Sequence, residues 1–245
     1  MEDRSGNPAL SNGVLGRVKD VESTQTATIS GTSFKILILL ALSIGSGFFG
    51  WQLMASSSAV SFVPLIGFSL LALVFALATA FKPTWSPFTA PLYALAQGFV
   101  MGAISQIYNA QLDGIVVQAI GLTGAIFFVS LWAFWLGLIK VTERFRVGVI
   151  IATLGVGLYY LVALVLGLFG ITVPLIYDSG PFGIIFSLVI IFIATLNLML
   201  DFDLIKRAEQ QKMPKVFEWY GAFALIVTLI WLYLEVLRLL SKTRG

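Results

Sequence analysis

Long apolar runs separated by short polar segments dominate the chain. A bilayer core of about 30 Å is crossed by roughly 20 apolar residues of helix. Seven runs reach that length. They lie at about 34–54, 59–81, 88–109, 115–139, 147–171, 181–204 and 216–240. The segments between them are short, so we expect neighbouring helices to be antiparallel. The pattern predicts an all-α integral membrane protein with seven transmembrane helices.

The start of the chain has a different character. Residues 1–33 are rich in Ser, Thr, Asn, Gly and charges of both signs, and they contain no apolar run suited to a signal peptide. We predict a flexible polar cytosolic tail over residues 1–33 and a single seven-helix transmembrane domain over residues 34–245.

The basic residues predict how the chain crosses the membrane. Cytosolic loops carry an excess of Lys and Arg. With the N-terminus inside, twelve of the fifteen basic residues fall in inner segments and none falls in an outer loop. Seven crossings place the other three, Arg238, Lys242 and Arg244, outside. We therefore predict a cytosolic N-terminus. The three basic residues at the C-terminal end are the exception to the excess of Lys and Arg in cytosolic segments.

Composition narrows the possible chemistry. The chain is 58% hydrophobic and 11% charged, whereas soluble domains carry about 25% charged residues. It has no Cys and no His, which removes disulfides, Cys/His zinc sites and serine–histidine triads. No phosphate-binding or dinucleotide-binding glycine motif occurs. A net charge of +3 is better explained by basic loops than by nucleic-acid binding. We expect neither an enzyme nor a resident cofactor, with the lipid bilayer as partner.

Small residues recur on several predicted helices. They are Ser43/Gly47 and Ser46/Gly50 on the first helix, Gly98/Gly102 on the third, and Gly148, Gly155 and Gly157 on the fifth. In lipid, close approach of two helix backbones requires small side chains. We interpret these positions as helix-packing contacts.

Polar residues at the end of the sixth predicted helix are the first functional candidates. Asn197 and Asp201 are four residues apart and share a face, whereas Asp203 points roughly 200° around the helix. Asp203 has Lys206 and Arg207 at i+3 and i+4, which favours a local ion pair. Asp201 has no such cation, and an intramembrane carboxylate is costly without a partner or purpose. Asp201 is therefore either functional or bonded to another helix.

The last predicted helix carries two further acids. Glu218 lies in its first turn, where capping and local pairing would stabilise a negative charge. Alternatively, Asp201, Asp203 and Glu218 converge at the cytosolic ends of the sixth and seventh helices. Such carboxylates would share a proton or bind a hard cation such as Ca²⁺. Glu235 is expected to pair with Arg238 at i+3.

The third predicted helix carries a row of polar side chains. These are Tyr93, Gln97, Ser105 and Tyr108. They either line a hydrated path or form hydrogen bonds between helices, and the second interpretation is favoured.

Five segments carry a family resemblance. They are NPALSN near the start, VTERFRVGVIIATLGVGLYYLV, LDFDLI at the end of the sixth helix, EWYGAF opening the seventh, and LYLEVLRLLSK near the C-terminus. Together they resemble the bacterial branch of the transmembrane Bax inhibitor motif family, over nearly the whole chain. The segment joining the sixth and seventh helices is the most specific.

The resemblance implies a seven-helix fold in which helix 7 is central in a bundle of six, located in a bacterial cytoplasmic membrane. It also implies a pH-sensitive calcium leak gated by two aspartates, one on helix 6 and one on helix 7, with Ca²⁺ as the transported ion. The helix 6 aspartate of that pattern matches Asp201, the possible Ca²⁺ ligand.

The sequence departs from this pattern at the second aspartate. The corresponding window, Phe223–Ile230, holds no acid, and Thr228 is its only polar residue. The basic residue that calcium-leak members carry on helix 2 is also missing. Asp203 or Glu218 substitutes from another position, or the switch is lost. Some bacterial relatives instead regulate a membrane-anchored protease through a cytosolic tail, and the polar residues 1–33 suit that alternative.

Overall fold

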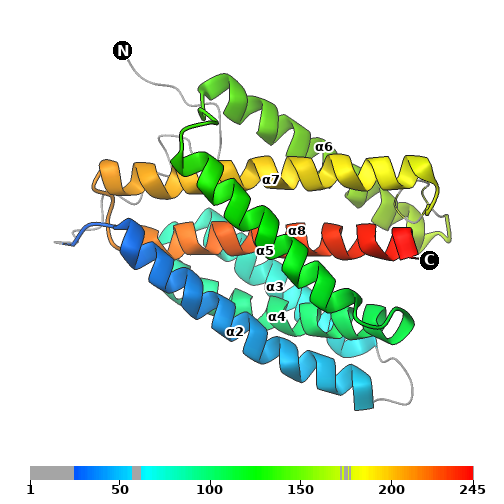
Figure 1. Cartoon of the computed structure of the whole chain (residues 1–245). Coiled ribbons are helices and arrows are strands. Elements are labelled where there is room, and N and C mark those ends of the chain that lie inside the picture. Colours follow the sequence, from blue (N-terminus) through cyan, green and yellow to red (C-terminus); the bar gives the residue numbers. More distant parts are fainter. Residues whose placement is uncertain (1–24, 57–61, 172, 174–175, 177, 245) are drawn as a thin grey trace. The chain divides into compact units, whose positions relative to one another are not determined.

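The computed structural model describes residues 25–244, apart from 57–61, 172, 174, 175 and 177. Within this part, the chain forms long helices and no strand (Figure 1). The helices are α2 (Ile29–Ser56), α3 (Phe62–Phe81), α4 (Ser86–Gln111), α5 (Ile115–Trp135), α6 (Glu143–Leu168), α7 (Pro181–Gln210) and α8 (Phe217–Arg244), with the short 3₁₀ helix η1 (Pro83–Trp85) before α4. Each of the seven α-helices is long and apolar enough to cross a membrane, which confirms the predicted seven-span, all-α architecture.

Two helices extend beyond the apolar runs that predicted them. Helix α2 begins at Ile29, five residues before the predicted start, because Thr28 caps it: the Thr28 hydroxyl accepts a hydrogen bond from the Gly31 N–H at 2.9 Å. Helix α7 continues to Gln210, six residues past its apolar run. A count of apolar residues misses such polar turns. Residues 1–24 of the predicted tail lie outside the described residues.

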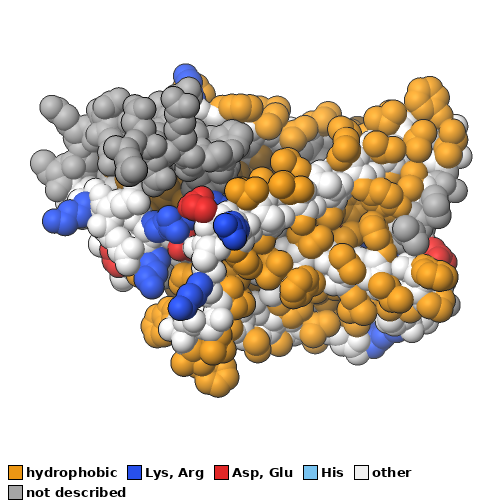
Figure 2. Space-filling model, turned by 90° about the horizontal axis from the view of Figure 1, so that it is seen from above, with side chains coloured by type: hydrophobic (Ala, Val, Ile, Leu, Met, Phe, Trp, Pro, Cys, Tyr) orange, Lys and Arg blue, Asp and Glu red, His pale blue; other side chains and the backbone are white. Residues whose placement is uncertain are grey.

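The exposed surface of the helices is strongly apolar. Trp135 and Leu168 are each 80% exposed, and many other large hydrophobic side chains are exposed on α2, α3, α5 and α6. Figure 2 shows hydrophobic side chains spread over the larger part of the molecule away from its left end, where charged side chains gather. Soluble monomers rarely expose large contiguous apolar patches, whereas lipid tails are a suitable environment for them. The surface therefore supports an integral membrane location.

The chain divides into two compact units. Unit 1 comprises Met1–Ala110 and Asp203–Val227, and unit 2 comprises Gln111–Phe202 and Thr228–Gly245. Helices α7 and α8 each contribute one end to each unit. The central position of the last helix, implied by the family resemblance, stays a prediction.

Unit 1 contains a close contact between α2 and α4. A Cβ atom at Gly102 would lie 1.8 Å from the Gly47 carbonyl oxygen, and one at Gly50 would lie 2.1 Å from that of Phe99. A Cβ atom at Gly98 would lie 2.3 Å from the Ser43 carbonyl oxygen. Only glycine permits backbones to approach so closely. The predicted small-residue packing is confirmed for these two helices.

The glycines of α6 behave differently. A Cβ atom at Gly148, Gly155 or Gly157 would meet no atom within 4 Å in the described part of the chain. The predicted packing role is therefore wrong for contacts within this chain. Spacing of small residues does not specify which helix face has a neighbour.

Unit 2 is held together by aromatic contacts between helices. Phe127 and Phe134 of α5 pack on Phe202 of α7, with ring centroids 5.8 and 5.7 Å apart. Tyr159 of α6 packs on Phe186 near the opposite end of α7 at 5.1 Å. These contacts fix α5 and α6 against α7.

Candidate functional site

Asp201 of α7 faces Thr228 of α8 within unit 2. The Thr228 side chain forms a hydrogen bond with the Asp201 carboxylate, and Thr228 is itself buried. The other carboxylate oxygen, Oδ2 of Asp201, is buried and has no hydrogen-bond partner among the described residues. The sequence singled out both residues, but only the structure brings them together.

Asn197 supports the same region from one helical turn away. Its Nδ2 donates to Thr153 Oγ1 of α6 at 2.7 Å and to the Ile193 carbonyl oxygen at 2.9 Å. Because Asn197 and Asp201 share a face of α7, the first bond fixes α6 beside the Asp201 region. Thr153 was not a sequence candidate, since a lone Thr within an apolar helix gives no distinctive signal.

The Asp201 site has the chemistry of a proton or cation site. Burying an ionised carboxylate oxygen without a partner is costly, and the cost is removed when that oxygen carries a proton or contacts a cation. A hydroxyl such as that of Thr228 both donates and accepts hydrogen bonds, so it suits either state. The described residues contain no group of three or more acidic, His or Cys side chains that could hold a metal ion.

Asp203 has a separate partner in unit 1. Its Oδ2 forms an ion pair with Arg207 Nε at 2.7 Å, and the Arg207 side chain is 40% exposed. The predicted i,i+4 pair is confirmed. Nothing in this geometry tests a gating role for Asp203, which stays a prediction.

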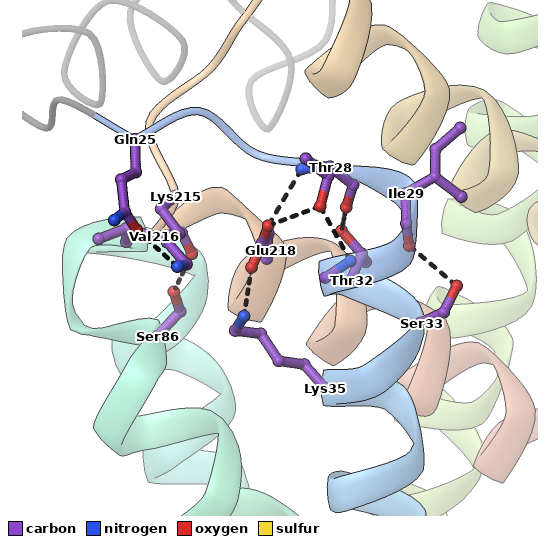
Figure 3. A network of polar contacts seen from close by, with 11 residues as sticks. Gln25, Thr28, Ile29, Thr32, Ser33, Lys35, Ser86, Lys215, Val216 and Glu218 are labelled. Carbon is purple, nitrogen blue, oxygen red and sulfur yellow. Dashed lines mark hydrogen bonds and ion pairs between the residues drawn. The ribbon is translucent and has the colours of Figure 1, made fainter.

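Glu218 lies at the start of α8 and is engaged by residues from the N-terminal region (Figure 3). Its Oε1 accepts hydrogen bonds from the Thr28 N–H at 3.0 Å and the Thr28 hydroxyl at 3.1 Å. Its Oε2 pairs with Lys35 of α2. Both partners are more than 180 residues away in sequence, so spacing could not identify them. The geometry indicates a structural contact, and a gating role for Glu218 stays a prediction.

Residues 25–29, which we call the N-terminal strap, run beside the segment that joins α7 to α8. Ala27 N–H donates to the Met213 carbonyl at 2.7 Å, and Lys215 N–H donates to the Gln25 carbonyl at 3.0 Å. Ile29 N–H donates to Glu209 Oε1 at 2.9 Å. The strap and Glu218 together fasten the start of α2 to the α7–α8 connection.

A second buried ionic group lies in unit 2, towards the C-terminal end of α8. Glu235 is 1% exposed, and its Oε1 and Oε2 each accept a hydrogen bond from Arg238 at 2.9 Å. Tyr160 of α6 donates its hydroxyl to Glu235 Oε1 at 2.7 Å, and Trp231 Nε1 donates at 3.3 Å. The predicted pairing of Glu235 with Arg238 is confirmed, whereas the part played by Tyr160 was not predicted.

Lys242 is also buried in unit 2. Its ammonium group donates to the Gly183 carbonyl oxygen at 2.9 Å and to Ser187 Oγ at 3.0 Å, both on α7. Arg238 and Lys242 are therefore side chains of a packed helix, not of a terminal tail.

The remaining candidates lie on α4 in unit 1. Gln97 is half-buried. Tyr93 packs edge-on against Phe223 of α8 at 5.0 Å, and Ser105 donates to the carbonyl of Met101 on its own helix at 2.7 Å. These contacts are typical of packing, and a supporting role for Gln97 stays a prediction.

Comparison with protein families gives one assignment. The model of the family described as Bax inhibitor 1 like matches residues 7–245, which include all seven helices. Neither curated proteins nor solved structures gave a match. With seven apolar helices long enough to span a bilayer, the chain belongs to the Bax inhibitor 1-like family and is an integral multi-pass membrane protein.

Proposed function

We propose that this protein is a pH-sensitive leak for calcium or other small cations, with Asp201 as its principal gate. The observation that carries the proposal is the buried Asp201 Oδ2, which has no hydrogen-bond partner in the described part of the chain. A proton and a cation compete for such an oxygen, because each neutralises the same buried charge. Cation passage through the site would therefore depend on pH.

Thr228 supports a gate that has a single carboxylate. It occupies the stretch of the last helix where the family pattern has a second aspartate, and it contacts Asp201. The Thr228 hydroxyl accepts a hydrogen bond from a protonated Asp201 and donates one to an ionised Asp201. A proton can thus bind and leave without breaking the contact between α7 and α8.

Calcium flux into liposomes tests the proposal. The purified protein is reconstituted, and Ca²⁺ entry is recorded from about pH 5 to pH 8, since burial moves carboxylate titration by several pH units. Wild type is compared with Asp201→Asn and with Asp203→Asn, which makes the same change two residues away, in an ion pair with a partly exposed Arg207, and tests the other candidate gate residue of α7.

We expect flux that titrates with pH in wild type and in Asp203→Asn, and flux that no longer titrates in Asp201→Asn. Absence of flux at every pH, in protein shown to be folded by its monodispersity and helical circular dichroism, would overturn the proposal.

A regulator of a membrane-anchored protease is the competing function, and the N-terminal strap is the observation that favours it. The strap fixes residue 25 beside the α7–α8 connection, which gives the preceding tail a defined point of attachment. Deleting residues 2–24 leaves the strap intact. A leak would retain its flux after this deletion, whereas regulation through the tail would be lost.

A further inference from the structure

Helices α7 and α8 contact each other through polar residues at two places in unit 2, and both contacts fit the same alignment of the two helices. Asp201 forms a hydrogen bond with Thr228, and Ser187 accepts one from Lys242. Ser187 lies 14 residues before Asp201, and Lys242 lies 14 residues after Thr228. Because seven residues make nearly two helical turns, each helix presents both of its residues on one face, about 21 Å apart.

The middle of this interface is also polar. Glu235 lies seven residues from both Thr228 and Lys242, so it belongs to the same face of α8. Ala194 occupies the corresponding middle position of α7 and is fully buried. Because its side chain is a single methyl group, it leaves space for Glu235 at this level of the interface. Tyr160 of α6 reaches the Glu235 carboxylate.

Helix α6 completes the arrangement with the same spacing. Thr153, which bonds to Asn197, lies seven residues before Tyr160, which bonds to Glu235. Three helices therefore place hydrogen-bonding side chains along one line, which we call the polar file. It runs from Asp201 and Thr228, past Glu235, to Lys242.

The end of the polar file that lies away from Asp201 carries more positive than negative charge. Glu235 contributes one negative charge, while Arg238 and Lys242 contribute two positive charges, so the group has a net charge of one positive. Glu235 is 1% exposed, Lys242 is 8% exposed, and the Arg238 side chain is 25% exposed. Asp178 also interacts electrostatically with Lys242, but it is exposed to solvent and therefore more strongly screened.

We propose that Glu235, Arg238 and Lys242 form a charge barrier, in series with Asp201, that restricts divalent cations. The inference rests on the proposed cation leak, because it requires a cation route past Asp201. Coulomb repulsion scales with the charge of the ion, so one buried positive charge opposes Ca²⁺ twice as strongly as K⁺. Rings and clusters of charged side chains set selectivity in this way in ion channels. Glu235 accepts hydrogen bonds from both Tyr160 and Arg238, which hold its carboxylate in place.

The test uses substitutions that break the same ion pair but change the charge in opposite directions. Glu235→Gln raises the net charge of the group to two positive, whereas Arg238→Gln lowers it to zero. Lys242→Gln also lowers it to zero and leaves the ion pair intact, so it is informative even if either of the other variants fails to fold. Arg244→Gln is the matched control, because it removes one positive charge from an exposed side chain of the same helix.

Each variant is reconstituted in liposomes, and Ca²⁺ and K⁺ fluxes are measured at one pH. We expect the ratio of Ca²⁺ to K⁺ flux to fall about tenfold in Glu235→Gln, to rise about tenfold in Arg238→Gln and Lys242→Gln, and to stay at the wild-type value in Arg244→Gln.

A ratio that shifts in the same direction in Glu235→Gln and Arg238→Gln, or that stays unchanged in Lys242→Gln, would overturn the barrier. If Asp201→Asn still abolishes the pH dependence in that case, the leak itself stands and only the barrier fails. Absence of flux from the wild-type protein would overturn both.

Discussion

Neutralising Glu218 is expected to destabilise the fold by leaving Lys35 without its counter-ion. Glu218 is 2% exposed and the Lys35 side chain is 12% exposed, so both charges are largely removed from water. Breaking a buried ion pair from one side costs about 3–5 kcal/mol, because the other charge stays buried and uncompensated. We expect Glu218→Gln to lower the free energy of unfolding by about 3 kcal/mol.

Thermal unfolding in a mild detergent measures this loss. For a chain of this size, 1 kcal/mol corresponds to about 2–4 °C, so Glu218→Gln should unfold about 6–12 °C below wild type. The control Asp203→Asn breaks an ion pair whose arginine is 40% exposed, and it should cost at most about 1 kcal/mol. The double variant Glu218→Gln/Lys35→Met removes both charges and should recover most of the loss.

Two results would refute this reasoning. One is a Glu218→Gln protein that unfolds within about 2 °C of Asp203→Asn, which would show that the Lys35 charge is not isolated by the fold. The other is a double variant as unstable as the single variant, which would assign the loss to the hydrogen bonds from Thr28 and not to the ion pair.

Two further predictions concern helix packing and the Asp201 site. Gly102→Ala places a Cβ atom 1.8 Å from the Gly47 carbonyl oxygen and should lower the free energy of unfolding by about 1–3 kcal/mol, because it separates α2 from α4. The control Gly155→Ala enters open space and should leave the free energy of unfolding unchanged or raise it by up to about 1 kcal/mol. Equal unfolding temperatures for the two variants would contradict the α2–α4 contact. Thr228→Asp adds a second carboxylate beside Asp201, and because two neighbouring carboxylates resist being ionised together, the midpoint of calcium flux against pH should move upward by about one unit or more. An unchanged midpoint would argue that Asp201 is not the titrating group.

The number of membrane spans and the local ion pairs were determined by the sequence alone. Bilayer thickness fixes how many apolar residues a crossing helix needs, so counting apolar runs was enough to predict seven spans. Pairs such as Asp203–Arg207 and Glu235–Arg238 were predictable because helix geometry brings residues at i+3 and i+4 together. Asp201 of α7 was predictable as a candidate because an intramembrane acid without a local cation is uncommon.

The partners of the buried polar groups were decided only by the tertiary structure. The contacts of Glu218 with Lys35 and of Asp201 with Thr228 depend on how each helix is rotated about its axis and on the register between helices. Hydrophobic periodicity fixes these in a soluble protein, where one face of each helix avoids water. A helix in lipid is apolar on every side, so its sequence carries little information about which face meets a neighbour. For this reason the sequence did not reveal that the glycines of α4 contact a neighbouring helix, whereas those of α6 contact none in the described part of the chain.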